Sequence, residues 1–250
     1  MPRTTRTAVL LTSILLLLAV GCSRSPEAKK ARYLERGDRY FAKEQYREAA
    51  LEYRNALRIE STNTQATRQL GLAYYQLGEL GQAFRYFLKT LEVEPDNLEV
   101  RLKLGQIYLM GARAADARAE AARVLQKEPR NLDALILMAG AAGTPEEIDA
   151  AIRQLESARA ASEAIARFHL ALAGLYLKKG DQAATERELQ EAAAREPKSA
   201  EAHSALASFY MSRSDRPHRR RKTRLPRSAP RNGMRAASIS ISINLPSFRQ

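Results

Sequence analysis

The chain has no tryptophan, a single cysteine and only three histidines among its 250 residues. With one cysteine, an intramolecular disulfide cannot form, and a cysteine-based zinc cluster lacks ligands. Aromatic residues, which strands favour, make up only 6% of the chain. Alanine, leucine, arginine and glutamate abound instead, and these residues either favour helices or lose little side-chain freedom in them. The composition therefore predicts an all-α protein.

Sequence signals for chemistry are also missing. The chain contains no glycine-rich phosphate loop, no His-Glu-x-x-His and no Gly-x-Ser-x-Gly. His169 and His203 lie 34 residues apart, which favours stacked helix residues over a catalytic pair. A carbohydrate-active or peptidoglycan enzyme would need a constellation that the sequence does not offer. We expect no enzyme activity, metal or cofactor, and neither a small-molecule substrate nor nucleic acid as a partner.

Positive charge is concentrated at the two ends of the chain. The formal net charge is +13, but residues 216–250 hold ten Lys or Arg residues and no acidic residue. Residues 1–21 hold two more, Arg3 and Arg6, so the body between them carries only about +1. The charges of the body are typical of an ordinary solvated helical surface.

The N-terminus has the pattern of an export signal. Arg3 and Arg6 precede an apolar run over residues 8–20, which is shorter than the roughly 20 residues of a membrane-spanning helix. Residues 1–21 are therefore predicted to be a cleaved signal peptide. The sequence Leu-Ala-Val-Gly-Cys at 18–22 resembles a bacterial lipobox, although Ala19 stands where leucine is usual. The alternative is a plain secretory signal followed by a chance cysteine.

The lipobox resemblance implies cleavage after Gly21 and lipidation of Cys22, including acylation of the new N-terminus. Two or more acyl chains give stable anchoring, whereas one gives only marginal binding. The residue after Cys22 is Ser23 rather than aspartate, which by the enterobacterial sorting rule favours the outer membrane. We therefore expect a lipid-anchored protein of a bacterial cell envelope, at the outer membrane facing the periplasm, with residues 22–29 as a tether.

A period of 34 residues runs through the rest of the chain. Small residues recur at this spacing, and an aromatic residue follows three positions later in every copy except the fourth. These small residues are Gly37, Gly71, Gly105, Ala139, Ala173 and Ala207. Such a period is typical of stacked supersecondary repeats, because one helix pair cannot bury its apolar face alone.

Each repeated residue has a physical role in a pair of antiparallel helices. A small residue at Gly71 lets the two helices approach closely, and Ala83 answers it from the second helix. Phe87 supplies a large side chain one turn later. Gly78 and Gly180 lie between helices, where left-handed backbone is often required.

The motifs at 69–75 (Gln-Leu-Gly-Leu-Ala-Tyr-Tyr), 81–84 (Gly-Gln-Ala-Phe) and 94–95 (Glu-Pro) resemble the tetratricopeptide repeat (TPR). The resemblance covers residues 30–212 and implies a right-handed α-solenoid of stacked antiparallel helix pairs. It gives five full repeats and one further helix. The repeats are expected to begin near Lys30, Thr64, Leu98, Leu132, Ala166 and Ala200.

The same resemblance implies a function. In the family, the first helix of each pair lines a concave groove that binds a protein or peptide partner. In the second and third repeats this predicts a groove lined by Arg68, Leu72, Tyr75, Gln76, Lys103, Gln106, Leu109 and Met110. The clamp that grips a C-terminal carboxylate in some members is not expected, since Leu34, Asp38 and Gln69 replace its lysine and asparagines.

The fourth repeat departs most from the pattern. Ala139 and Ala142 replace its small–large pair, and Gly140 and Gly143 are expected to loosen its first helix. Thr144 followed by Pro145 nevertheless predicts a strongly capped second helix. We expect thin packing and a weak joint here; an ordinary well-packed repeat is the alternative.

The array stops inside its sixth repeat, and residues 213–250 form a basic tail. Its first part cannot bury enough apolar surface to fold alone. Three interpretations stay open: a basic arm for anionic lipid or polyanion, a solvated tail without function, or a segment that is not native to the protein. The leading functional hypothesis is a lipid-anchored scaffold or adaptor binding a partner segment in its groove. The alternative is a membrane- or polyanion-binding protein acting through the tail.

Overall fold

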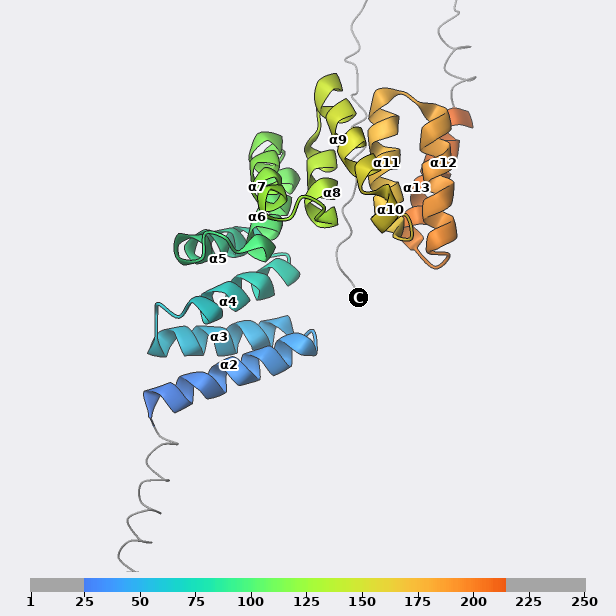
Figure 1. Ribbon diagram of the computed structural model, residues 1–250. Coiled ribbons are helices and arrows are strands. Elements are labelled where there is room, and N and C mark those ends of the chain that lie inside the picture. The colour runs from blue at the N-terminus through green and yellow to red at the C-terminus, as the bar shows by residue number, and fades with distance from the viewer. Residues whose placement is uncertain (1–24, 215–250) are drawn as a thin grey trace, which may run out of the picture. The chain divides into compact units, whose positions relative to one another are not determined.

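The computed structural model describes residues 25–214 (Figure 1). Over these residues the chain forms twelve α-helices and no strand, so the expected all-α fold of helix pairs is confirmed. The helices are α2 (Pro26–Ala42), α3 (Tyr46–Ile59), α4 (Thr64–Gln76), α5 (Leu80–Val93), α6 (Leu98–Met110), α7 (Ala114–Lys127), α8 (Leu132–Ala141), α9 (Pro145–Ser157), α10 (Arg159–Ser162), α11 (Ala166–Lys179), α12 (Gln182–Arg195) and α13 (Ala200–Ser214).

The chain divides into two compact units between Val124 and Leu125. The N-terminal unit contains α2 to α6 and most of α7, and the C-terminal unit contains α8 to α13. Within residues 25–214, no helix is both long and apolar enough to cross a membrane. The predicted signal peptide, the predicted lipidation residue Cys22 and the part of the predicted tail from residue 215 lie outside the described residues.

The repeat starts agree with the 34-residue period except at the first repeat. Helices α4, α6, α8, α11 and α13 begin at Thr64, Leu98, Leu132, Ala166 and Ala200, the residues expected. Helix α2 begins at Pro26 rather than at Lys30. Ser25 caps it, with its side chain accepting a hydrogen bond from Ala28 N, and Pro26 suits the first turn. Residues 26–29, expected to belong to a tether, are therefore helical.

Three loops between repeats share one capping arrangement. In each, an asparagine side chain accepts a hydrogen bond from the backbone N–H three residues on and donates to a glutamate three residues before, satisfying a free N–H of the new helix. The pairs are Asn63 with Glu60, Asn97 with Glu94, and Asn131 with Glu128. The Glu-x-x-Asn spacing thus fixes where α4, α6 and α8 begin.

Glycine permits the close helix contacts that the sequence predicts. A Cβ atom on Gly37 would lie 2.5 Å from Cε1 of Tyr53, and one on Gly71 would lie 2.8 Å from Cδ1 of Phe87. Tyr53 and Phe87 are both fully buried. The aromatic ring of the second helix therefore fills the space that the missing side chain leaves in the first.

The turns within repeats use left-handed backbone at a recurring position. Gly78 and Gly180 have φ of 75° and 84°, as expected from the sequence. Glu44 and Ala112 occupy the corresponding places with φ of 59° and 57°. Because a side chain makes this conformation unfavourable, Glu44 and Ala112 carry strain that the two glycines avoid.

The fourth repeat shares a buried core with the fifth, in which Leu135, Ala139 and Leu155 lie together with Phe168 and Leu172 of α11. Small residues on α8 bring these larger side chains close. The repeat's own two helices, α8 and α9, contact each other less extensively than the helices of the pairs α2–α3, α4–α5 and α11–α12 do, which agrees with the expected thin packing within this pair. The predicted helix start is confirmed: Thr144 and Glu147 form a capping box at α9.

Helix α8 ends early, at Ala141, and a side chain from α11 covers its end. Lys178 Nζ donates to the carbonyl oxygens of Ala139, Gly140 and Ala142 at 3.3, 3.1 and 2.8 Å. A cation at a helix C-terminus satisfies free carbonyls and interacts favourably with the helix dipole. Burial lowers the pKa of Lys178. The short helix α10, which the 34-residue pattern does not predict, then leads into α11.

Candidate partner-binding surface

Three predicted groove residues meet between α4 and α6 of the N-terminal unit. The Tyr75 hydroxyl donates to Gln106 Oε1 at 2.8 Å. Lys103 Nζ lies 5.0 Å from the centroid of the Tyr75 ring, within the range of a cation–π interaction. The tyrosine is thus held at both its ring and its hydroxyl by residues that are one repeat further along the chain.

The surroundings of Tyr75 make a rigid, half-buried aromatic surface. Its ring lies 6.2 Å from that of the buried Phe87, and burial raises the pKa of its hydroxyl. Gln76 and Leu109 are also half-buried, and Met110 at the end of α6 is 46% exposed. The face therefore combines a fixed aromatic ring, a positive charge, amide groups and a flexible apolar side chain.

Two other predicted groove residues are already engaged within the protein. Leu72 is only 7% exposed and packs with Ala83, Phe87 and Val100, so its prediction as a contact residue is wrong: the neighbouring helices already fill the space around it. Arg68 forms an ion pair with Glu94 at 3.2 Å. A partner that used Arg68 would have to compete with Glu94.

The histidines belong to a recurring structural arrangement. At the fourth position of repeats three, five and six, a basic or imidazole side chain hydrogen-bonds the backbone carbonyl six residues earlier. The pairs are Arg101 with Pro95, His169 with Glu163, and His203 with Pro197. Two of these side chains also reach a glutamate on the second helix: Arg101 pairs with Glu120 at 2.7 Å, and His169 Nδ1 lies 2.8 Å from Glu188 Oε2. These residues fasten the loop before the repeat to the helix pair.

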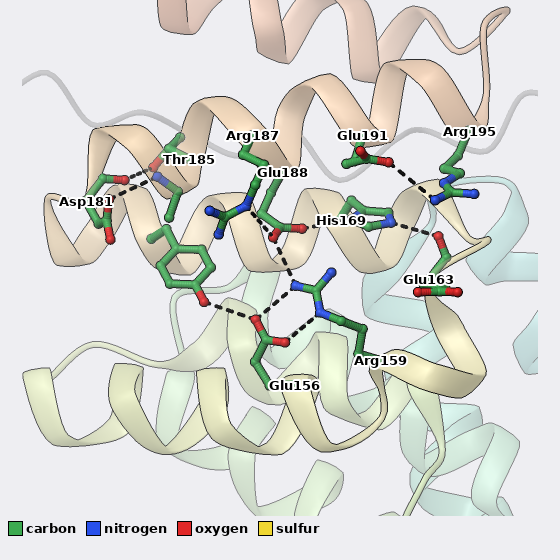
Figure 2. A network of polar contacts seen from close by, with 12 residues as sticks. Glu156, Arg159, Glu163, His169, Asp181, Thr185, Arg187, Glu188, Glu191 and Arg195 are labelled. Atoms are coloured by element: carbon green, nitrogen blue, oxygen red, sulfur yellow. Dashed lines mark hydrogen bonds and ion pairs between the residues drawn. The ribbon is translucent and has the colours of Figure 1, made fainter.

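In the C-terminal unit this arrangement extends into the polar network of Figure 2. Glu188 is 1% exposed and also accepts a hydrogen bond from Arg159 at 2.9 Å. Arg159 in turn binds Glu156 through two nitrogens, at 2.6 and 2.9 Å. The hydrogen bond from Arg159 lowers the pKa of Glu156. Because a carbonyl oxygen can only accept, His169 Nε2 must carry a proton toward Glu163.

The network has the features of a structural element rather than of a catalytic site. Its charges pair with one another, and it ties α10, α11 and α12 of the C-terminal unit together. Among residues 25–214, no group of three or more histidine, cysteine or acidic side chains is placed to hold a metal ion.

Comparisons with known proteins agree with the helix-pair architecture. A TPR repeat family model matches residues 37–78, and a tetratricopeptide repeat model matches residues 68–132. A TPR protein of Parabacteroides merdae has a similar structure with a TM-score of 0.65 at 16% identity, covering 76% of each chain. A thermophilic TPR protein of Thermus thermophilus gives 0.58 at 19% identity, covering 73% of this chain and 99% of that one.

A third similar structure is YrrB, described as a TPR protein with an unusual peptide-binding site. Its TM-score is 0.58 at 16% identity, covering 72% of this chain and 90% of that one. No curated protein sequence matches the chain. The repeated helix pairs define a protein of the interaction-scaffold class. Together the two models identify tetratricopeptide repeats over residues 37–132 of the chain.

Proposed function

We propose that the protein is a lipid-anchored adaptor of a bacterial cell envelope that binds an extended segment of a partner protein on the face of α4 and α6. The observation that carries the binding part is the fixed contact of Tyr75 with Gln106 and Lys103. A peptide-binding site in the similar structure YrrB supports a peptide as the class of ligand.

The chemistry of the face suits an extended acidic segment. A tyrosine held at both ends loses little entropy on binding, which favours it as an energetic anchor. The Gln106 amide offers N–H donors for a backbone carbonyl. Lys103 adds a positive charge, and Met110 offers an adaptable apolar contact. An acidic residue next to an apolar one in the partner segment would match this arrangement.

Peptide selection on the purified full chain tests the site. A displayed library of random peptides is selected on the wild type, and the affinity of the enriched peptides is measured by fluorescence anisotropy. Tyr75→Ala is expected to weaken binding at least about tenfold, as loss of a central aromatic anchor does. Tyr210→Ala is the matched control, since Tyr210 is 40% exposed on α13 of the other unit. Equal binding by wild type and Tyr75→Ala, with unchanged circular dichroism, would place the site elsewhere.

The anchor is supported by the sequence at residues 18–22. Metabolic labelling with palmitate is expected to mark the wild type and not Cys22→Ala. The unlabelled variant should no longer be found in the membrane fraction as a cleaved, lipidated protein. Density-gradient separation of the two membranes then tests the outer-membrane assignment that Ser23 favours. Labelling that persists in Cys22→Ala would overturn the anchor without affecting the peptide-binding test.

A further inference from the structure

Five basic residues share one side of α2, the first described helix of the N-terminal unit; Figure 1 draws this helix in blue. They are Lys29, Arg32, Arg36 and Arg39 in α2 and Lys43 at its C-cap. Their spacing alternates between three and four residues. At about 100° per residue in an α-helix, the five positions fall within an arc of about 80°. Below, this set is called the α2 basic stripe.

The stripe faces away from the core of the unit. Leu34 and Phe41 of α2 pack against the buried residues of α3, and Gly37 meets Tyr53 there. Lys29, Arg32, Arg39 and Lys43 are exposed, and the Arg36 side chain is 43% exposed. The cations are thus on the solvent side of a helix that is anchored by its opposite side.

The stripe holds more positive charge than its carboxylate neighbours balance. Arg36 pairs with Glu52 at 2.8 Å and Arg39 with Glu35 at 2.6 Å. Within residues 25–214, no carboxylate contacts the side chain of Lys29, Arg32 or Lys43. Three cations therefore remain available to an external anion.

The C-terminal half of the stripe is hollowed. Arg36, Arg39, Tyr40 and Lys43 line a shallow hollow of about 160 Å³. A second tyrosine, Tyr33, lies under Arg36, whose guanidinium carbon is 4.9 Å from the ring centroid. Cations with tyrosines between them suit a phosphate-bearing surface, because tyrosine favours the boundary between water and lipid.

We propose that the α2 basic stripe lies on the anionic phospholipid headgroups of the membrane that holds the protein. This proposal rests on the lipid anchor of the proposed function, since α2 begins only four residues after Cys22. Four residues span at most about 14 Å, so the acyl chains would hold the start of the stripe close to the headgroups. Attraction of basic side chains to an anionic surface acts within about 8 Å at physiological salt.

Vesicle binding without the acyl chains tests the stripe by itself. The protein used comprises residues 22–214 with Cys22→Ser, which keeps every described helix and lacks both the anchor and the basic tail. Its binding is measured by co-sedimentation with phosphatidylcholine vesicles and with vesicles containing about 30% phosphatidylglycerol, as an anionic surface. The stripe predicts binding to the anionic vesicles alone, decreasing as salt is raised.

A matched pair of variants separates the stripe from general positive charge. Lys29→Gln, Arg32→Gln and Lys43→Gln together should weaken anionic binding by up to about a hundredfold, at about fivefold per cation. The control replaces Arg130, Arg153 and Lys198, three exposed cations of the C-terminal unit, by glutamine and changes net charge equally. If both triple variants bind like the unaltered fragment, or if both lose binding equally, the stripe proposal is wrong.

The outcomes also distinguish the stripe from the anchor and from a different anion. Normal palmitate labelling of the full chain with no stripe-dependent vesicle binding would leave the anchor standing and overturn the stripe. Stripe-dependent vesicle binding without palmitate labelling at Cys22 would support the stripe and overturn the anchor. Binding to inorganic polyphosphate that exceeds binding to anionic vesicles would assign the stripe to a soluble polyanion and overturn the lipid proposal.

Discussion

Replacing Gly37 by alanine would place a methyl group against the ring of Tyr53. The new Cβ would lie 2.5, 2.8 and 3.0 Å from Cε1, Cδ1 and Cζ of that ring, all closer than two carbon atoms can approach without repulsion. The ring is fully buried, and its hydroxyl donates to Asp38 Oδ1 at 2.8 Å. The ring therefore cannot move away without opening packing and weakening this hydrogen bond.

Two opposing effects set the size of the change. Alanine is about 1 kcal/mol better than glycine in a helix interior. Overpacking a filled core costs about 1–3 kcal/mol, and loss of the bond to Asp38 would add about 1 kcal/mol. The net expectation is that Gly37→Ala destabilises the N-terminal unit by about 1–3 kcal/mol. Gly81→Ala in α5 is the control, because its Cβ would meet no atom within 4 Å; it should leave stability unchanged or raise it by up to about 1 kcal/mol.

Urea unfolding followed by circular dichroism measures both variants. Because two compact units need not unfold in one transition, hydrogen exchange resolved by mass spectrometry should accompany it and show the loss in α2 and α3. A Tyr53→Leu substitution, which removes the ring, should recover part of the loss through a coupling of about 0.5–3 kcal/mol. If Gly37→Ala is as stable as the wild type, close approach at this position is not what the glycine provides.

Three further changes probe local features. Ala112→Gly, which relieves left-handed strain at φ 57°, should hold or raise stability by up to about 1 kcal/mol in urea unfolding; a clear loss would contradict that strain. Glu156→Gln should be less stable than wild type near neutral pH. Because Arg159 lowers the pKa of Glu156 below its ordinary 4.5, this difference should shrink as pH falls below about 4.5; a constant gap would count against the pair. Lys178→Met should cost about 1–2 kcal/mol by exposing the end of α8, and an unchanged thermal midpoint would refute the cap.

Much of the fold follows from spacing alone. Small residues every 34 positions locate the repeats, and the structure starts four helix pairs and the single helix α13 at the expected residues, from Thr64 to Ala200. This works because close helix approach needs a small side chain, as Gly71 shows against Phe87. Helix α10 could not be predicted in this way. It lies just before α11, at the one of these repeat boundaries where Ile165 replaces the capping asparagine and makes no side-chain cap.

The candidate site was harder to predict than the fold. The resemblance to the repeat family identifies the helix face that includes both Leu72 and Tyr75. It does not tell which of these two side chains is covered by the next helix. Leu72 is buried beside Val100, whereas Tyr75 is half-buried and bonded to Gln106. That difference depends on side-chain packing between repeats, which residue spacing does not contain.

The α2 basic stripe shows why net charge is a poor guide to a charged surface. Over residues 22–215 the net charge is close to zero, yet Lys29, Arg32 and Lys43 share one exposed face without carboxylate partners within the described part of the chain. Glutamates elsewhere, such as Glu120 and Glu188, are buried in ion pairs. These buried glutamates lower the net charge of the chain, but they do not neutralise the cations exposed on α2. The arrangement of charges along each helix therefore decides what the surface attracts.

The buried pairs also explain why histidine here favours structure over chemistry. His169 stands where Arg101 stands two repeats earlier, and each bonds both a carbonyl six residues back and a glutamate nineteen residues on. An arginine can fill this role only as a donor, since it has no acceptor. The equivalence therefore indicates that this position requires donated hydrogen bonds. These bonds hold the loop against the helix pair, which is a structural role.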